Sequence, residues 1–135
     1  MKALDTSVLL ALLEGDRSAR DLTRKLKAVE VATTEANLLE LAYLAGKGLA
    51  RSRTRRREAL DRLRRKMTVL PIDRRAVTEV ERRVSRGTLP SGPLVAAMLG
   101  ALEAAGCDEL FTADPRECPG HWRFKVTRFA RRSPK

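Results

Sequence analysis

Three acidic residues of this chain lie within or directly after apolar segments, where a charged side chain requires an explanation. Glu40 is the one residue between Leu38 and Ala45 that is neither apolar nor aromatic. Burying a carboxylate in such a helix is costly unless the charge is paired or bound to a cation. Asp5 and Asp114 each follow a short apolar segment, near opposite ends of the chain. Carboxylates brought together from such distant segments repel one another, which indicates a cation between them.

The same residue types also have simpler explanations. Asp, Thr and Ser are preferred helix N-caps, so any residue of the Asp-Thr-Ser run at 5–7 could cap a following helix. Glu35 lies in the first turn of a predicted helix, where the helix dipole favours an acid. We therefore expect Glu35 to be structural. For Asp5 we expect a place at the carboxyl end of a strand, facing Glu40 and Asp114, with little capping role.

The elements that must position these acids alternate along the chain. Short apolar runs predict strands at 2–5, 29–33, 68–73, 108–115 and 122–129. Helical periodicity occupies residues 6–16, 17–28, 35–48, 49–67, 74–87 and 92–106. Strands separated by helices imply an α/β fold, and we expect a three-layer α/β/α sandwich with a central parallel sheet. Sites in such sheets lie at the carboxyl ends of the strands, where Asp5 and Asp114 are expected.

Asp5, Glu40 and Asp114 together resemble the acidic site of the PIN-domain family. These proteins are nucleases that include the VapC-type toxins of prokaryotic toxin–antitoxin modules. The resemblance covers essentially the whole chain and rests on the stretches ALDTSVLLALL, NLLELAYLAG and LVAAMLGALEAAGCDELFTAD. The first and last stretches are fairly specific together, whereas each alone is a weak signal.

The resemblance implies a metal-dependent endoribonuclease that hydrolyses RNA phosphodiester bonds. Asp5, Glu40 and Asp114 would be its catalytic and metal-binding residues. Mg²⁺ or Mn²⁺ would be the cofactor, because hard divalent cations prefer carboxylate oxygens. A bound metal can activate a water and stabilise charge on a phosphate, so no His or Cys is required. Hydroxyl groups expected to line this site, each with a cap or strand position as its alternative, belong to Thr6, Ser91 and Thr112.

One position departs from the family pattern. The third acid of the family opens the helix that here reads GPLVAAMLGAL, and Gly92 takes its place, directly after Ser91. No nearby residue is an obvious substitute, because Glu103 lies three turns along the helix and Asp108 and Glu109 fall beyond its end. Losing a carboxylate lowers the charge that holds a hard cation. Two interpretations stay open: an active ribonuclease, or a catalytically weakened or inactive PIN-fold protein that binds RNA or a protein partner.

The formal net charge of +11 points to a polyanionic partner. The segment 47–66 holds ten Lys or Arg against two acids, and the tail 121–135 adds six basic residues and no acid. Single-sign patches of this kind attract nucleic acids through phosphate contacts, although a solvated helix face is the alternative. The arginines we expect to contact RNA are Arg51, Arg53, Arg55, Arg56 and Arg57.

At 135 residues the chain is expected to form one PIN-like domain over 1–135, with a basic helical segment at 47–66 and a basic tail at 121–135. No apolar run is long enough to cross a membrane and no signal peptide is visible, so we expect a cytoplasmic protein. The spacing of the two cysteines indicates neither a disulfide framework nor a zinc site. The resemblance further implies RNA and a small antitoxin protein as partners, and a homodimer.

Overall fold

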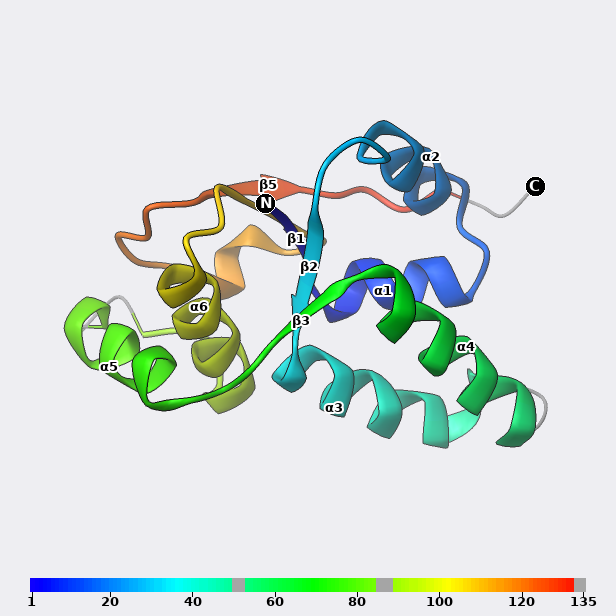
Figure 1. The fold of residues 1–135 in the computed structure, drawn as a ribbon, viewed down its shortest axis with the longest axis horizontal. Helices are drawn as coiled ribbons and strands as arrows, with labels where there is room; N and C mark the ends of the chain where they lie inside the picture. The colour runs from blue at the N-terminus through cyan, green and yellow to red at the C-terminus, as the bar shows by residue number, and fades with distance from the viewer. Residues whose placement is uncertain (50–52, 85–88, 133–135) are drawn as a thin grey trace.

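The computed structural model describes residues 1–49, 53–84 and 89–132 of the chain. In this part of the chain five strands form one parallel sheet in the order β3-β2-β1-β4-β5 (Figure 1). The strands are β1 (Lys2–Leu4), β2 (Val31–Thr34), β3 (Thr68–Leu70), β4 (Glu109–Thr112) and β5 (Lys125–Arg128). Each overlaps a strand expected from the sequence, and the central parallel sheet is confirmed.

Helices connect the strands. They are α1 (Thr6–Leu13), α2 (Arg17–Lys25), α3 (Glu35–Leu44), α4 (Arg53–Lys66), α5 (Arg74–Arg83) and α6 (Pro93–Ala105). Two shorter elements are the π-helical η1 (Ala45–Leu49), which continues α3, and the 3₁₀ turn η2 (Pro115–Glu117), which follows β4. The helix expected over 35–48 therefore changes its hydrogen-bonding pattern after Leu44. Of the five arginines expected to bind RNA, Arg51 lies outside the described residues.

Side chains that alternate along the strands divide the core in two. On one face, Ala3 of β1 and Leu110 of β4 pack with residues of α5 and α6, such as Leu99. On the other face, Leu4 packs with residues of α1, α2, α3 and α4, such as Leu9. Helices thus cover both faces of the sheet, which confirms the three-layer α/β/α sandwich.

The start of α3 is fixed by a reciprocal cap. The Thr34 side chain accepts from the backbone N–H of Asn37, and the Asn37 side chain accepts from the backbone N–H of Thr34. Asn37 Nδ2 also donates to Thr6 Oγ1 at 3.1 Å and lies 3.1 Å from Met98 Sδ. Because α3 packs against both α1 and α6, this asparagine links three helices beside the carboxyl end of the sheet.

The α5–α6 pair is unusually close at one glycine. A Cβ on Gly100 would lie 2.3 Å from the backbone oxygen of Ala76 and 2.6 Å from Val80 Cγ2. Ala76 is buried against α6, whereas Val77 is 51% exposed. The close approach at Gly100 turns the face of Ala76 and Val80 toward α6, and Val77 lies on the exposed side of α5.

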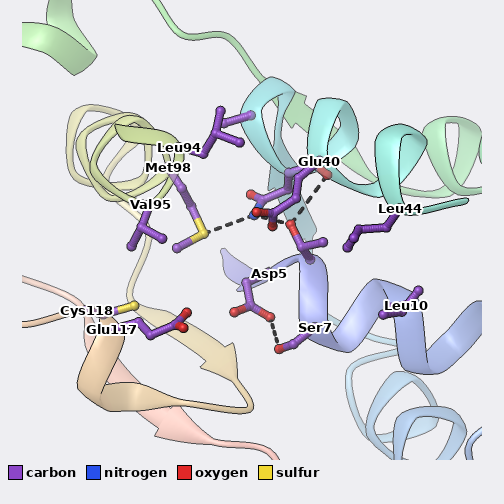
Figure 2. A pocket seen from close by; sticks show the side chains of 13 residues that line it. Asp5, Ser7, Leu10, Glu40, Leu44, Leu94, Val95, Met98, Glu117 and Cys118 are labelled. Carbon is purple, nitrogen blue, oxygen red and sulfur yellow. Dashed lines mark hydrogen bonds between the residues drawn. The ribbon is translucent and has the colours of Figure 1, made fainter. Parts of the chain in front are cut away.

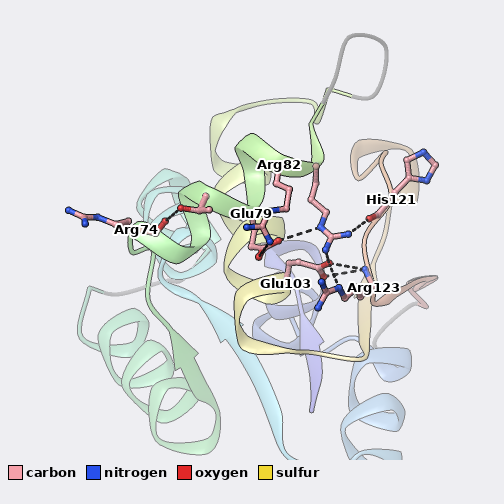
Figure 3. Close-up of polar contacts among 8 residues, drawn as sticks. Arg74, Glu79, Arg82, Glu103, His121 and Arg123 are labelled. Carbon is pink, nitrogen blue, oxygen red and sulfur yellow. Dashed lines mark hydrogen bonds and ion pairs between the residues drawn. The ribbon is translucent and has the colours of Figure 1, made fainter.

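A buried ionic network joins α5, α6 and the segment before β5 (Figure 3). The Glu103 side chain is 2% exposed and accepts from the backbone N–H of Arg123 at 3.1 Å. Arg83 Nη2 lies 3.1 Å from Glu103 Oε1, and Arg83 Nη1 donates to the His121 carbonyl at 3.0 Å. These contacts give Glu103 a structural role between α5, α6 and the segment before β5.

Candidate active site

Asp5 lies directly after β1 and continues its pairing with β4. Its backbone N–H donates to the carbonyl of Phe111 at 3.2 Å. Its Oδ1 accepts from the Val8 backbone N–H at 3.2 Å and from the Ser7 hydroxyl, so Asp5 is the N-cap of α1. The expectation of little capping role was therefore wrong, because the residue that ends the strand also begins the helix. The strand-end position that was expected for it is present.

Burial changes the acidity of Asp5. The residue is only 8% exposed, and this desolvation raises the pKa of its carboxyl group. Hydrogen bonds from Ser7, Thr112 and Val8 favour the ionised form and act against that rise. A buried carboxyl group whose ionised form is stabilised by several hydrogen bonds is typical of a functional site.

A pocket of about 240 Å³ opens beside Asp5, between α1, α3, α6 and η2 (Figure 2). Glu40 enters it from α3 and Glu117 from η2. The carboxylates of Asp5 and Glu117 point toward each other across the pocket (Figure 2). The lining residues are Asp5, Thr6, Ser7, Leu10, Ala36, Asn37, Glu40, Leu44, Leu94, Val95, Met98, Glu117 and Cys118. Two of the three predicted acids therefore share one pocket.

Asp114, the third predicted acid, is not among the residues that line this pocket. Its Oδ1 is 3.0 Å from Arg116 Nε and also accepts from the Arg116 backbone N–H at 3.1 Å. These hydrogen bonds to Arg116 hold the pKa of the Asp114 carboxyl below its ordinary value. The structure thus places a positive partner on Asp114 that Asp5 lacks.

The three predicted hydroxyl residues lie in different positions. Thr6 lines the pocket, where its Oγ1 accepts from Asn37. Thr112 is buried, and its hydroxyl favours the ionised form of Asp5. Ser91 is exposed outside the pocket lining, and its backbone N–H donates to the carbonyl of Glu117 at 3.3 Å.

Glu117 is a pocket acid that the sequence interpretation missed. Partial burial and the negative charges of Asp114, Asp5 and Glu40 raise the pKa of its carboxyl group. Glu117 is therefore close enough to these three carboxylates for their charge to disfavour its ionised form. A signal was present, because Glu117 stands five residues after the end of β4, whose carboxyl end was expected to carry the site.

Cys118 follows Glu117 into the same pocket but has a different chemical character. Burial is the main cause that raises the pKa of its thiol to about 12. A thiol of that acidity stays protonated at neutral pH, so it is neither a nucleophile nor a ready metal ligand. The other acidic side chains that line the pocket are those of Asp5, Glu40 and Glu117.

This donor set suits a hard divalent cation. Among the described residues, no three acidic, His or Cys side chains are gathered closely enough to enclose a metal ion. Mg²⁺ does not need such a cage, since it keeps several waters and is usually held through one or two carboxylates. Asp5 and Glu40, from two elements that meet at one pocket, meet that requirement. They are the residues that would hold Mg²⁺ or Mn²⁺.

Comparison with protein-family models gives a match to the PIN domain over residues 2–117. The chain therefore belongs to the PIN-domain family. No curated protein matches the chain closely enough to count as a relative.

Solved structures share the fold over nearly the full chain. A chain from the DNA-bound VapBC2 complex of Rickettsia felis has a TM-score of 0.78 at 13% identity, covering 96% of this chain and 98% of that one. A chain from the DNA-bound VapBC complex of Salmonella typhimurium has a TM-score of 0.76 at 19% identity, with the same coverage. The Mycobacterium tuberculosis toxin VapC20, which cleaves the sarcin–ricin loop, has a TM-score of 0.61 at 18% identity, covering 84% and 92%. At these identities the likeness establishes the shared fold.

The helices of the structure also bear on whether the chain could cross a membrane. Within the ranges 1–49, 53–84 and 89–132, no helix combines the length and the apolar character that a bilayer crossing requires.

Proposed function

We propose that this chain is a metal-dependent endoribonuclease of the PIN-domain type and the toxin of a toxin–antitoxin module. The observation that carries the proposal is the meeting of Asp5 and Glu40 in one pocket at the carboxyl end of a parallel sheet. Membership of the PIN-domain family supports it. No structural role in the fold requires the carboxylates of Asp5 and Glu40 to line the same pocket.

The residues of the pocket have separate tasks in this proposal. A bound Mg²⁺ or Mn²⁺ would activate a water and stabilise charge on the scissile phosphate. Asp5 is held for this task by the Val8 N–H and the Ser7 hydroxyl, which fix one carboxylate oxygen. Asn37 fixes α3 against α1 through Thr6 and thereby sets the position of Glu40 one turn further along α3.

The proposed partners are RNA as substrate, a small antitoxin protein and a second copy of the chain. Two of the solved structures that share the fold are VapBC complexes, which supports the antitoxin. Leu39 and Tyr43 are 63% and 62% exposed on α3, and this apolar surface supports a homodimer. The cytoplasm is the proposed location, since RNA is the substrate.

The first prediction is that Asp5→Asn abolishes RNA cleavage. Purified protein is incubated with RNA and Mn²⁺ or Mg²⁺, with EDTA as the metal-free arm. We expect metal-dependent cleavage by the wild type and a loss of at least about 100-fold in Asp5→Asn, because the carboxylate that would hold the metal is gone. Asn remains a good N-cap, so α1 stays capped.

Asp73→Asn is the matched control for this experiment. Asp73 is the N-cap of α5 and accepts from the Ala76 N–H at 3.2 Å, but it does not line the pocket. The same substitution there should leave cleavage unchanged. Equal losses in both variants would mean that capping, and not the pocket carboxylate, controls the activity.

The second candidate function is a weakened or inactive PIN protein that binds RNA or a protein partner without cleavage. Two observations favour it: Gly92 carries no carboxylate, and Arg116 is paired with Asp114. RNA that is bound but not cleaved, by wild type and Asp5→Asn alike and with either metal, would establish this function in place of the first.

A further inference from the structure

The candidate active-site pocket has no basic residue of its own. Among the described residues, its lining holds the acids Asp5, Glu40 and Glu117 and no Lys, Arg or His. The phosphates of an RNA chain are repelled by such a surface unless cations lie next to it. The basic side chains beside the pocket therefore decide how RNA can approach the two acids that would hold the metal.

Arg116 stands on η2 directly before Glu117, and Asp114 holds its side chain. The Arg116 Nε donates to Asp114 Oδ1 at 3.0 Å, and its Nη2 donates to Oδ2 at 3.4 Å. These two contacts fix the Nε–Nη2 edge of the guanidinium group. An exposed ion pair of this kind contributes little to folding stability, so stability alone does not account for it.

The other edge of the same guanidinium group is free. The Arg116 side chain is 91% exposed, and its Nη1 donates to no residue within 1–49, 53–84 and 89–132. An arginine side chain has five N–H donors, and Asp114 accepts from two of them, so three remain on the Nη1–Nη2 edge. Such an edge binds a phosphate through two parallel hydrogen bonds. Asp114 thus orients a group that suits a phosphate.

Arg128 brings a second cation to the same carboxylate from another element. It is the last residue of β5 and pairs in register with Thr112 of β4, so it also lies at the carboxyl end of the sheet. Hydrogen bonds from Arg116 are the main cause that lowers the pKa of Asp114, and the positive charge of Arg128 adds to this effect. The Arg128 side chain is exposed and forms no hydrogen bond or ion pair within the described part of the chain. Its charge is available to an anionic ligand.

We infer that Arg116 and Arg128 bind an RNA phosphate next to the pocket, Arg116 through its Nη1–Nη2 edge, and that Asp114 orients Arg116 for this contact. The inference rests on the proposed ribonuclease function and deepens it, because it names residues that hold the substrate backbone beside the reacting bond. Asp114 is then a positioning residue that acts through Arg116.

The test measures the binding of a labelled single-stranded RNA by fluorescence anisotropy. The protein is the full chain carrying Asp5→Asn, with EDTA present, so that no RNA is cleaved. We expect Arg116→Gln to weaken binding by about tenfold, because charge-assisted hydrogen bonds to a phosphate are lost. It should also lower the slope of log affinity against log salt by about 0.7. Arg128→Gln should weaken binding and lower the slope in the same direction.

Arg82→Gln is the matched control. Arg82 is an exposed arginine whose Nη1 lies 3.5 Å from Glu79 Oε1 on α5. The next residue, Arg83, contacts Glu103 near the C-terminal end of α6, whereas the pocket lies at the N-terminal end of that helix. This change should leave the affinity and the slope unchanged, and thermal unfolding establishes that each variant is folded. Equal effects of Arg82→Gln and Arg116→Gln would overturn the inference, because a general loss of charge would explain both.

Two further variants test the orientation of Arg116. Arg116→Lys keeps the positive charge but has no planar edge with two parallel donors, so binding should stay weak. Asp114→Asn removes a negative charge, which by itself would strengthen RNA binding, whereas the loss of the contact that orients Arg116 should weaken it. Full affinity in Arg116→Lys, or an unchanged or higher affinity in Asp114→Asn, would overturn the oriented contact.

The remaining outcomes separate the inference from the proposed function. If the wild type cleaves RNA with Mn²⁺ or Mg²⁺, and Arg116→Gln and Arg128→Gln bind RNA like Arg82→Gln, the inference alone is overturned. If the wild type neither cleaves nor binds RNA, the proposed function is overturned together with the inference.

Discussion

A single carboxylate at Asp5 begins a helix and lines the pocket at the same time. One of its oxygens accepts from Val8 and Ser7, while the group as a whole stays 8% exposed. The desolvation that raises its pKa also destabilises the folded state when the group is ionised. A charge kept at such a position despite its effect on stability is what function, and not folding, requires.

Because the buried, ionised carboxylate of Asp5 destabilises the folded state, we predict that Asp5→Asn stabilises the protein at neutral pH. Because the pKa of Asp5 is raised on folding, the native state binds this proton more readily than the unfolded state does, and wild-type stability falls as pH rises through the folded pKa. Asn keeps the capping oxygen without the charge. We expect its midpoint of thermal unfolding to exceed that of the wild type by a few degrees at pH 8, with the difference closing toward pH 4.

For Asp73→Asn we predict the opposite change in stability at pH 8. The hydrogen bond from the Ala76 N–H is the main cause that lowers the pKa of Asp73 on folding. Its contribution to stability is present above the unfolded pKa and is lost as pH falls, so this variant should be less stable than the wild type at pH 8 and approach it in acid. Parallel pH profiles of the two variants, measured by thermal unfolding from pH 4 to 8, would contradict the account of Asp5.

At the scale of elements, the sequence predicts the sheet and its helices because each carries a periodic signal. The strand ends place Asp5 on the sheet, and the apolar run around Glu40 places that acid on an interior helix face. Glu117 was missed because a 3₁₀ turn of three residues has no periodicity, and only the backbone bond from Ser91 shows where it lies. The pairing of Asp114 with Arg116 is equally local and depends on the turn geometry.

The buried face of α5 could not be read from its valines either. The stripe that includes Val77 is regular in sequence, yet Val77 is half exposed. Which face turns inward depends on how closely α6 approaches, and that distance depends on a glycine in another element, Gly100. A residue without a side chain gives no apolar signal, so its partner helix cannot be oriented from the pattern alone.

The contact at Gly100 predicts a steric effect of Gly100→Ala. Its Cβ would lie 2.3 Å from the Ala76 carbonyl oxygen, a backbone atom that can move only with the whole of α5. We expect the free energy of unfolding to fall by roughly 1–3 kcal/mol, measured by urea denaturation. Gly46→Ala is the control, because a Cβ there meets nothing within 4 Å. Equal effects of the two changes would show that the α5–α6 contact yields without strain.

At the scale of the whole molecule, the basic residues behind the net charge of +11 differ in how far they are paired with acids. Arg131 is paired with Glu14 at 2.6 Å, Arg132 is paired with Asp21, and the Arg132 backbone N–H donates to Asp16 at 2.7 Å. These contacts attach the described end of the basic tail to α1 and α2. On α4, by contrast, several basic side chains are exposed, among them Arg57, Arg62 and Arg65. We therefore predict that RNA contacts α4, and that the described part of the tail serves the fold.

This division predicts different salt dependences of RNA binding, measured by fluorescence anisotropy in the Asp5→Asn background, where RNA is not cleaved. Each phosphate contact to a single strand contributes about 0.7 to the slope of log affinity against log salt. The triple change of Arg57, Arg62 and Arg65 to Gln should lower that slope by about 2 if each contacts a phosphate. Changing Arg131 and Arg132 to Gln should lower the midpoint of thermal unfolding and leave the slope nearly unchanged, because those cations are already neutralised within the fold. A slope that falls as much in the tail variant as in the α4 variant would assign RNA binding to the tail as well.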